Sequence, residues 1–82
     1  MSQKDKLYKS VISGKQDKNI IFTDLCKLFD IMEFEGRING SHHIYYREDI
    51  PEILNFQPDG NMAKPYQVKQ ARNFIKKYDL EV

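Results

Sequence analysis

The chain has 82 residues, which is enough for one domain and too few for two. Hydrophobic residues make up 40% of the sequence and charged residues 30%, a globular rather than a disordered composition. A domain of this size buries only about 60% of the surface that its unfolded chain exposes, so a deep cofactor pocket is not expected. The net charge of +1 excludes a whole-molecule attraction to nucleic acid, so a nucleic-acid site would need local clustering of basic groups.

Cys26 is the only cysteine, which excludes an intramolecular disulfide and a zinc site built from several thiolates. It lies on the predicted core face of a helix, so we expect a buried, inert thiol. The apolar run within residues 19–22 is too short to span a bilayer, and no signal peptide is recognised at the start. We therefore expect a soluble protein of the reducing cytoplasm, without a cofactor or a metal.

Two helices are predicted in the first part of the chain. Apolar side chains recur at helical spacing over residues 4–13, and Gly14 can supply the left-handed cap that ends a helix there. Residues 15–19 are polar and indicate a loop. A second helix is predicted from about Thr23 to Met32, with Thr23 as its candidate N-cap, because apolar residues occur every three or four positions.

Three strands and a last helix follow. Residues 33–38 and 42–47 read as the two strands of a hairpin around an Asn-Gly pair, and residues 52–57 read as a third strand. Residues 58–61 break the chain, and a helix is predicted from Pro65 to about Tyr78, since proline suits a first turn. The simplest way to bury these patterns is an α+β fold, with helices packed on one face of a three-stranded antiparallel sheet.

The sequence allows two registers for the hairpin. A two-residue turn at Asn39-Gly40 would put Phe34 on the same face as His43, whereas a three-residue loop through Ser41 would put Phe34 with His42. A slip of one residue moves every side chain to the other face. Periodicity alone therefore does not say which histidine faces the open side of the sheet.

The last helix carries a basic stripe. Lys69, Arg72 and Lys76 fall within a narrow arc at 100° per residue, and Lys64 precedes the helix near its positive end. A stripe of this kind suits successive phosphates of a nucleic acid. An ordinary solvated helix face has the same pattern.

His42 and His43 are the only histidines. A histidine can give and take protons near neutral pH, and RNA cleavage needs a base for the 2′-hydroxyl, an acid for the leaving 5′-oxygen and cations for the phosphate. Two adjacent residues of a strand point to opposite faces, which argues against a shared zinc site. The alternative interpretation is that both are polar strand residues near a turn.

The segment Gly40-Ser41-His42-His43-Ile44-Tyr45-Tyr46 resembles the Gly-Ser-His-His-Ile-Phe segment of HicA-family toxins. The run at residues 52–57 and the segment Lys64-Pro65-Tyr66 also lie where that family has its third strand and last helix. The resemblance covers roughly residues 20–80. It leaves residues 1–19 as an N-terminal helical extension and residues 20–82 as the toxin-like domain.

The resemblance implies a fold like that of double-stranded-RNA-binding domains and cleavage of messenger RNA that depends on His42. Gly40 and Ser41 would let the RNA backbone approach the turn. By position, the resemblance assigns backbone contacts in the last helix to Lys69 and Arg72, and less directly to Lys64 and Lys76.

The resemblance also implies a partner and a biological role. The protein would be the toxin of a toxin–antitoxin system that acts in stress responses, and a HicB-type antitoxin would cover the His42 surface. We expect the isolated chain to be monomeric. Two other functions fit the same pattern, a non-catalytic RNA-binding module and a protein-interaction domain that uses the basic stripe for docking.

Overall fold

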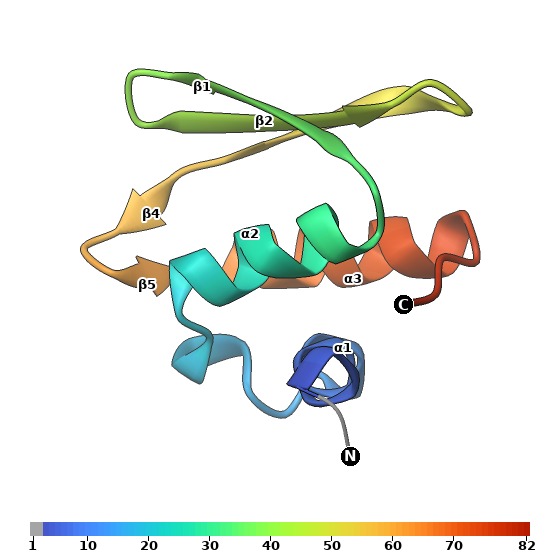
Figure 1. Ribbon diagram of the computed structural model, residues 1–82. Coiled ribbons are helices and arrows are strands. Elements are labelled where there is room, and N and C mark those ends of the chain that lie inside the picture. Colours follow the sequence, from blue (N-terminus) through green and yellow to red (C-terminus); the bar gives the residue numbers. More distant parts are fainter. Residues whose placement is uncertain (1–2) are drawn as a thin grey trace.

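The computed structural model describes residues 3–82, which form an α+β fold, as predicted. A three-stranded antiparallel sheet is covered on one face by helices, and a two-stranded hairpin lies at one end of the molecule (Figure 1). The elements in chain order are α1 (Gln3–Ser13), a 3-10 helix η1 (Asp17–Asn19), α2 (Phe22–Ile31), β1 (Glu35–Asn39), β2 (His42–Arg47), β3 (Ile50–Phe56), β4 (Pro58–Asp59), β5 (Met62–Ala63) and α3 (Pro65–Lys77).

The elements form three layers (Figure 1). The sheet lies on α2 and α3, and these two helices contact each other through the rings of Phe29 and Phe74, 6.4 Å apart. Helix α1 packs against the other side of α2 and α3, where Val11 is buried and the Tyr8 hydroxyl donates to the Leu80 carbonyl at 2.8 Å. The predicted N-terminal extension is thus continuous with the core over its described residues.

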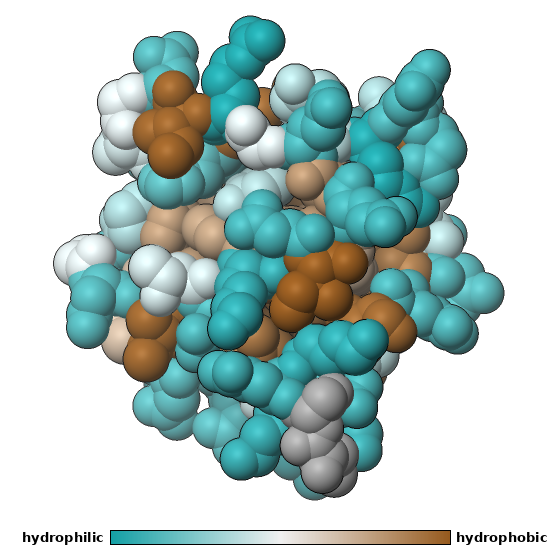
Figure 2. All heavy atoms as spheres, in the orientation of Figure 1, coloured by the Kyte–Doolittle hydropathy of each residue, from teal (hydrophilic) through white to brown (hydrophobic). Residues whose placement is uncertain are grey.

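Several apolar side chains reach the surface. Figure 2 shows apolar side chains reaching the surface in scattered patches between hydrophilic ones on this face. The large apolar residues with exposed side chains are Ile21, Ile38, Ile53 and Tyr66. None of the helices within residues 3–82 is long and apolar enough to cross a membrane.

Helix α2 forms because its apolar residues lie on one face, where Phe22, Leu25, Leu28 and Phe29 are buried. The prediction of Thr23 as the N-cap is wrong. Ile21 occupies the N-cap position, without a side-chain cap, and the helix begins at Phe22. The Phe22 N–H donates instead to the Asn61 carbonyl at 3.0 Å, so a tertiary contact satisfies one of the free donors at the helix start.

Both long core helices end in the same left-handed motif. Glu33 after α2 has φ 66° and Asp79 after α3 has φ 52°. The Phe34 N–H then donates to the Phe29 carbonyl at 3.0 Å, as in a Schellman motif, and the two rings meet edge to face at 5.1 Å. The chain therefore leaves α2 in a fixed direction toward β1.

The observed loop of the hairpin differs from both predicted loops. Asn39 pairs with His42, so the two loop residues are Gly40 and Ser41. Gly40 alone has a positive φ, 63°, which is the type II′ pattern with glycine first. Phe34 shares its face with His43, as the shorter of the two predicted turns implied. His42 consequently lies on the sheet face that the helices leave open.

The hairpin β4–β5 and the 3-10 helix η1 were not predicted. Ile21 forms a β-bridge with Met62, and the Ala63 N–H donates to the Ile20 carbonyl at 2.8 Å. These contacts bring the start of α2 next to the segment that enters α3. The segment that follows β3 thus connects the start of α2 with the start of α3.

Candidate functional site

His42 stands at the start of β2, on the open face of the sheet, and its side chain is exposed. Its Nδ1 lies 3.1 Å from Oδ1 of Asn55 on β3. An amide oxygen can only accept a hydrogen bond, so in the neutral ring this contact is made by the tautomer that carries its proton on Nδ1. Nε2 then carries the lone pair that a general base requires.

Gln57 approaches the same imidazole from the end of β3. Its side-chain amide nitrogen donates to Ser41 Oγ at 3.0 Å and lies 3.4 Å from His42 Nε2. A donor facing Nε2 agrees with the tautomer that Asn55 selects. We call Ser41, His42, Asn55 and Gln57 the histidine cluster.

The histidine cluster is connected to the first turn of α3 through Gln67. Gln67 is a buried polar residue with 5% of its surface exposed. Its Oε1 accepts the backbone N–H of Gln57 at 3.0 Å, and its Nε2 lies 3.4 Å from the Tyr66 hydroxyl. Asn55, Gln57 and Gln67 were not predicted as site residues, because only the strand register and the packing of α3 bring them together.

His43 faces the helices. Its ring meets Phe22 edge to face at 4.8 Å, which gives it a packing role. The two histidines therefore diverge, as predicted for neighbours on a strand. Within residues 3–82, no group of three histidine, cysteine, aspartate or glutamate side chains is placed to hold a metal ion.

The predicted basic residues lie on α3 or directly before it. Lys64 directly precedes α3, at the end of the helix that Gln67 connects to the histidine cluster. Lys69 is exposed beside β3, and Lys76 lies about 18 Å beyond Lys64 along the helix axis, at 1.5 Å per residue. None of these three lysines forms a hydrogen bond or an ion pair with a residue of the histidine cluster in the described part of the chain.

Arg72 has a structural contact that the sequence did not predict. Its guanidinium pairs with the Asp17 carboxylate at 2.9 Å and donates to the Val11 carbonyl at 3.2 Å. The side chains of Arg72 and Asp17 are 13% and 23% exposed. Arg72 thus connects α3 to η1 and α1.

Arg37 is a basic residue near His42 that was not predicted to belong to the site. It pairs with Ile44 across the β1–β2 ladder, so its side chain is exposed on the open face, like that of His42. Arg37 and His42 are diagonal neighbours, about 7–8 Å apart in this geometry and within reach of a long side chain. Only the observed register reveals this placement.

Cys26 is half-buried at the margin of the core, and burial raises the pKa of its thiol. Burial likewise raises the pKa of the Tyr45 hydroxyl. A thiol that stays protonated at neutral pH is a poor nucleophile. The structure thus provides no nucleophilic role for Cys26.

Comparisons of the chain with protein-family models, with curated proteins and with solved structures gave no match. The geometry supplies an exposed, oriented imidazole on an open sheet face.

Proposed function

We propose that this protein is a metal-independent endoribonuclease that cleaves messenger RNA with His42, as the resemblance to HicA-family toxins implies. The observation that supports it is the exposed imidazole of His42, whose Nδ1 is held by Asn55. An oriented imidazole with a free nitrogen is what general acid–base cleavage of RNA requires.

In the proposed reaction, Nε2 of His42 removes the proton from a ribose 2′-hydroxyl. The 2′-oxygen then attacks the adjacent phosphorus, and the bond from phosphorus to the 5′-oxygen breaks. The leaving 5′-oxygen takes a proton from the imidazolium or from water. The products are a 2′,3′-cyclic phosphate and a 5′-hydroxyl, and the imidazole returns to its neutral form.

Positive charge for the phosphates would come from two directions. Arg37 lies on the open face with His42. Lys64 directly precedes α3, and Lys69 lies on the half of α3 that Gln67 joins to the histidine cluster. The space around Gly40 is open, since a Cβ there would meet nothing within 4 Å. An RNA strand would therefore pass over the Gly40 turn toward the start of α3.

The proposal includes an inhibitory partner. The His42 side chain is exposed, and no segment within residues 3–82 covers it. An active nuclease of this kind needs control in the cell. A HicB-type antitoxin that covers the open face over His42 would supply it.

The test compares two matched variants, His42→Phe and His43→Phe, on a single-stranded RNA oligonucleotide. Loss of a general acid–base residue costs about 10²–10⁴-fold in rate, so His42→Phe should lose cleavage to that extent. His43→Phe keeps an aromatic ring against Phe22 and should cleave like the wild type. Mass spectrometry of the wild-type products should show a 2′,3′-cyclic phosphate, and circular dichroism should show that both variants fold.

Two outcomes would contradict the proposal. Equal cleavage by wild type and His42→Phe would remove His42 from the reaction. RNA binding by the wild type without any cleavage would identify a non-catalytic RNA-binding module on the same fold.

A further inference from the structure

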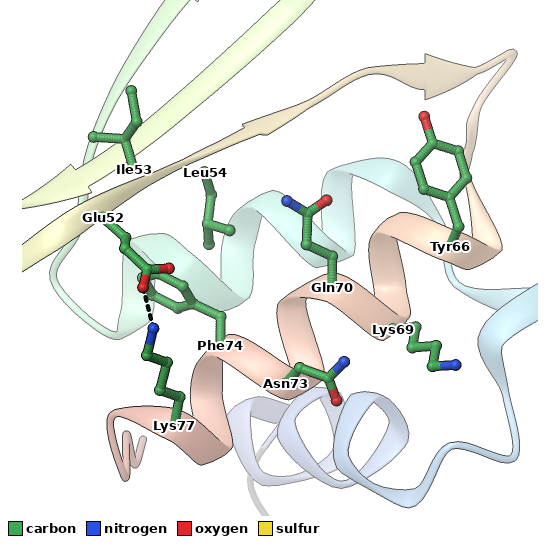
Figure 3. A pocket seen from close by; sticks show the side chains of 9 residues that line it. All are labelled: Glu52, Ile53, Leu54, Tyr66, Lys69, Gln70, Asn73, Phe74 and Lys77. Carbon is green, nitrogen blue, oxygen red and sulfur yellow. Dashed lines mark hydrogen bonds and ion pairs between the residues drawn. The ribbon is translucent and has the colours of Figure 1, made fainter.

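A groove of about 490 Å³ runs between α3 and strand β3 (Figure 3). Leu54 and Phe74 form its apolar floor and are both buried. Tyr66 stands at one end of the groove and Lys77 at the other, where Lys77 pairs with Glu52. The groove shares no residue with the histidine cluster.

Strand β3 is an edge of the sheet, because its only strand partner within residues 3–82 is β2. Backbone polar groups alternate between the two edges of a strand. The Gln57 N–H turns toward α3, where it donates to Gln67 Oε1. The same alternation directs the backbone groups of Asn55 and Ile53 to this outer edge, which is a template for a further strand.

The helix wall of the groove is basic. Helix α3 contains Lys69, Arg72, Lys76 and Lys77 and no acidic residue. Of these, Lys69 and Lys77 line the groove, and Lys69 forms no ion pair within residues 3–82. Glu52 is the one acidic residue among those that line the groove. An occupant of this groove should therefore carry negative charge.

We propose that β3 and α3 form a docking site for an extended acidic segment of a partner protein, which adds to the outer edge of β3 as a fourth strand. Main-chain hydrogen bonds to an edge strand give affinity, and pockets for alternate side chains give specificity. The docking site lies apart from His42, and its existence does not depend on nuclease activity.

The spacing of the two groove lysines determines the length of the acidic segment. Lys69 and Lys77 lie about 12 Å apart along the helix axis. The first and fifth residues of an extended strand lie about 13 Å apart and point to the same side. Acidic side chains at positions one and five would thus meet the two lysines, while an apolar side chain at position three would lie over Leu54 and Phe74.

The probe is the capped peptide Asp-Thr-Val-Thr-Asp, added to the ¹⁵N-labelled full chain without RNA. We expect saturable shifts and slowed hydrogen exchange at the amides of Ile53 and Asn55. The peptide Lys-Thr-Val-Thr-Lys should bind at least tenfold more weakly. The acidic peptide with methylated backbone nitrogens at residues 2 to 4 should also bind at least tenfold more weakly, because it lacks the N–H donors for strand pairing.

Three variants locate the site. Ile53→Pro removes an outward N–H, a change that edge strands tolerate, and should weaken binding at least tenfold. Lys69→Glu should weaken it to the same extent. Lys76→Glu, on the same helix but outside the groove, is the matched control and should bind like the wild type.

The proposal is overturned if the acidic peptide leaves Ile53 and Asn55 unshifted at millimolar concentration. It is also overturned if the methylated peptide binds equally, or if Lys76→Glu weakens binding as much as Lys69→Glu. If an oligouridylate shifts the groove resonances and the acidic peptide does not, the groove is an RNA surface. The peptide-binding measurements do not involve RNA cleavage, so their outcome is independent of the role of His42.

Discussion

His42 and Asn55 are joined diagonally across the β2–β3 ladder. Asn55 pairs directly with Ile44, yet its Oδ1 reaches Nδ1 of His42 at 3.1 Å. The position of the imidazole is thus set by the pairing of two strands, and its tautomer is set by a side chain on the second one.

The first prediction concerns Asn55→Asp. A carboxylate beside the imidazole stabilises the positive charge of the ring. Because the proposed base must be neutral, the rise of cleavage rate with pH should move to higher pH. The measurement is the pH–rate profile of RNA cleavage for wild type and variant.

Asn61→Asp is the control for that experiment. Asn61 lies in the exposed turn of the β4–β5 hairpin, so this substitution adds the same charge outside the histidine cluster. Its profile should match that of the wild type. A profile of Asn55→Asp that also stays in place would contradict the role of His42 as the titrating base.

Gln67→Met is predicted to destabilise the fold. The methionine has a similar volume, but it leaves the Gln57 N–H without its acceptor. An unsatisfied polar group costs about 1–3 kcal/mol of the free energy of unfolding. Urea unfolding measures the loss. Gln70→Met, the same change at an exposed position one turn on, should alter the free energy by less than about 0.5 kcal/mol.

The Arg72–Asp17 pair should contribute to stability rather than to RNA binding. Asp17→Ala leaves a largely buried guanidinium with only the Val11 carbonyl, and it should cost about 1–2 kcal/mol after allowance for partial exposure. Arg72→Met combined with Asp17→Ala should cost less than the sum of the single changes. Thermal unfolding of the four proteins checks this. Additive effects, or a loss of RNA affinity by folded Arg72→Met, would contradict it.

The parts of the fold that follow from local signals were predictable. Strand β2 begins at His42, as predicted, because a glycine-bearing turn and alternating residues mark it. Helix α3 begins at Pro65 and ends at Lys77, one residue before the predicted end, because proline marks the first turn. The exact register was not predictable, since the Gly40-Ser41 and Asn39-Gly40 turns use the same kind of signal.

The surroundings of His42 were not predictable, because they depend on contacts between distant segments. Asn55 is a partner only through the β2–β3 register, and the Gln57 contact with Gln67 needs the docking of α3. Arg72 looked like a member of a solvated basic stripe. Its burial depends on the place of η1, whose short sequence around Asp17 indicated only a loop.

Stability should fall at alkaline pH because of Tyr45 and Cys26. Burial raises the pKa of both groups in the folded chain above their ordinary values of 10.0 and 9.0. The unfolded chain therefore loses these protons first as the pH rises. The stabilisation that burial of the neutral forms provides is complete below pH 9 and declines above it, by at most about 1.4 kcal/mol per pH unit for each group.

Urea unfolding of Tyr45→Phe between pH 8 and pH 11 isolates this effect. The variant keeps the ring, which lies 5.7 Å from that of Phe29, and it loses the titrating hydroxyl. Its free energy of unfolding should therefore fall less steeply above pH 10 than that of the wild type. Tyr46→Phe, the same change on the next residue and the open face, should keep the wild-type slope. Parallel slopes for wild type and Tyr45→Phe would show that the Tyr45 hydroxyl ionises as readily in the folded chain as in the unfolded one.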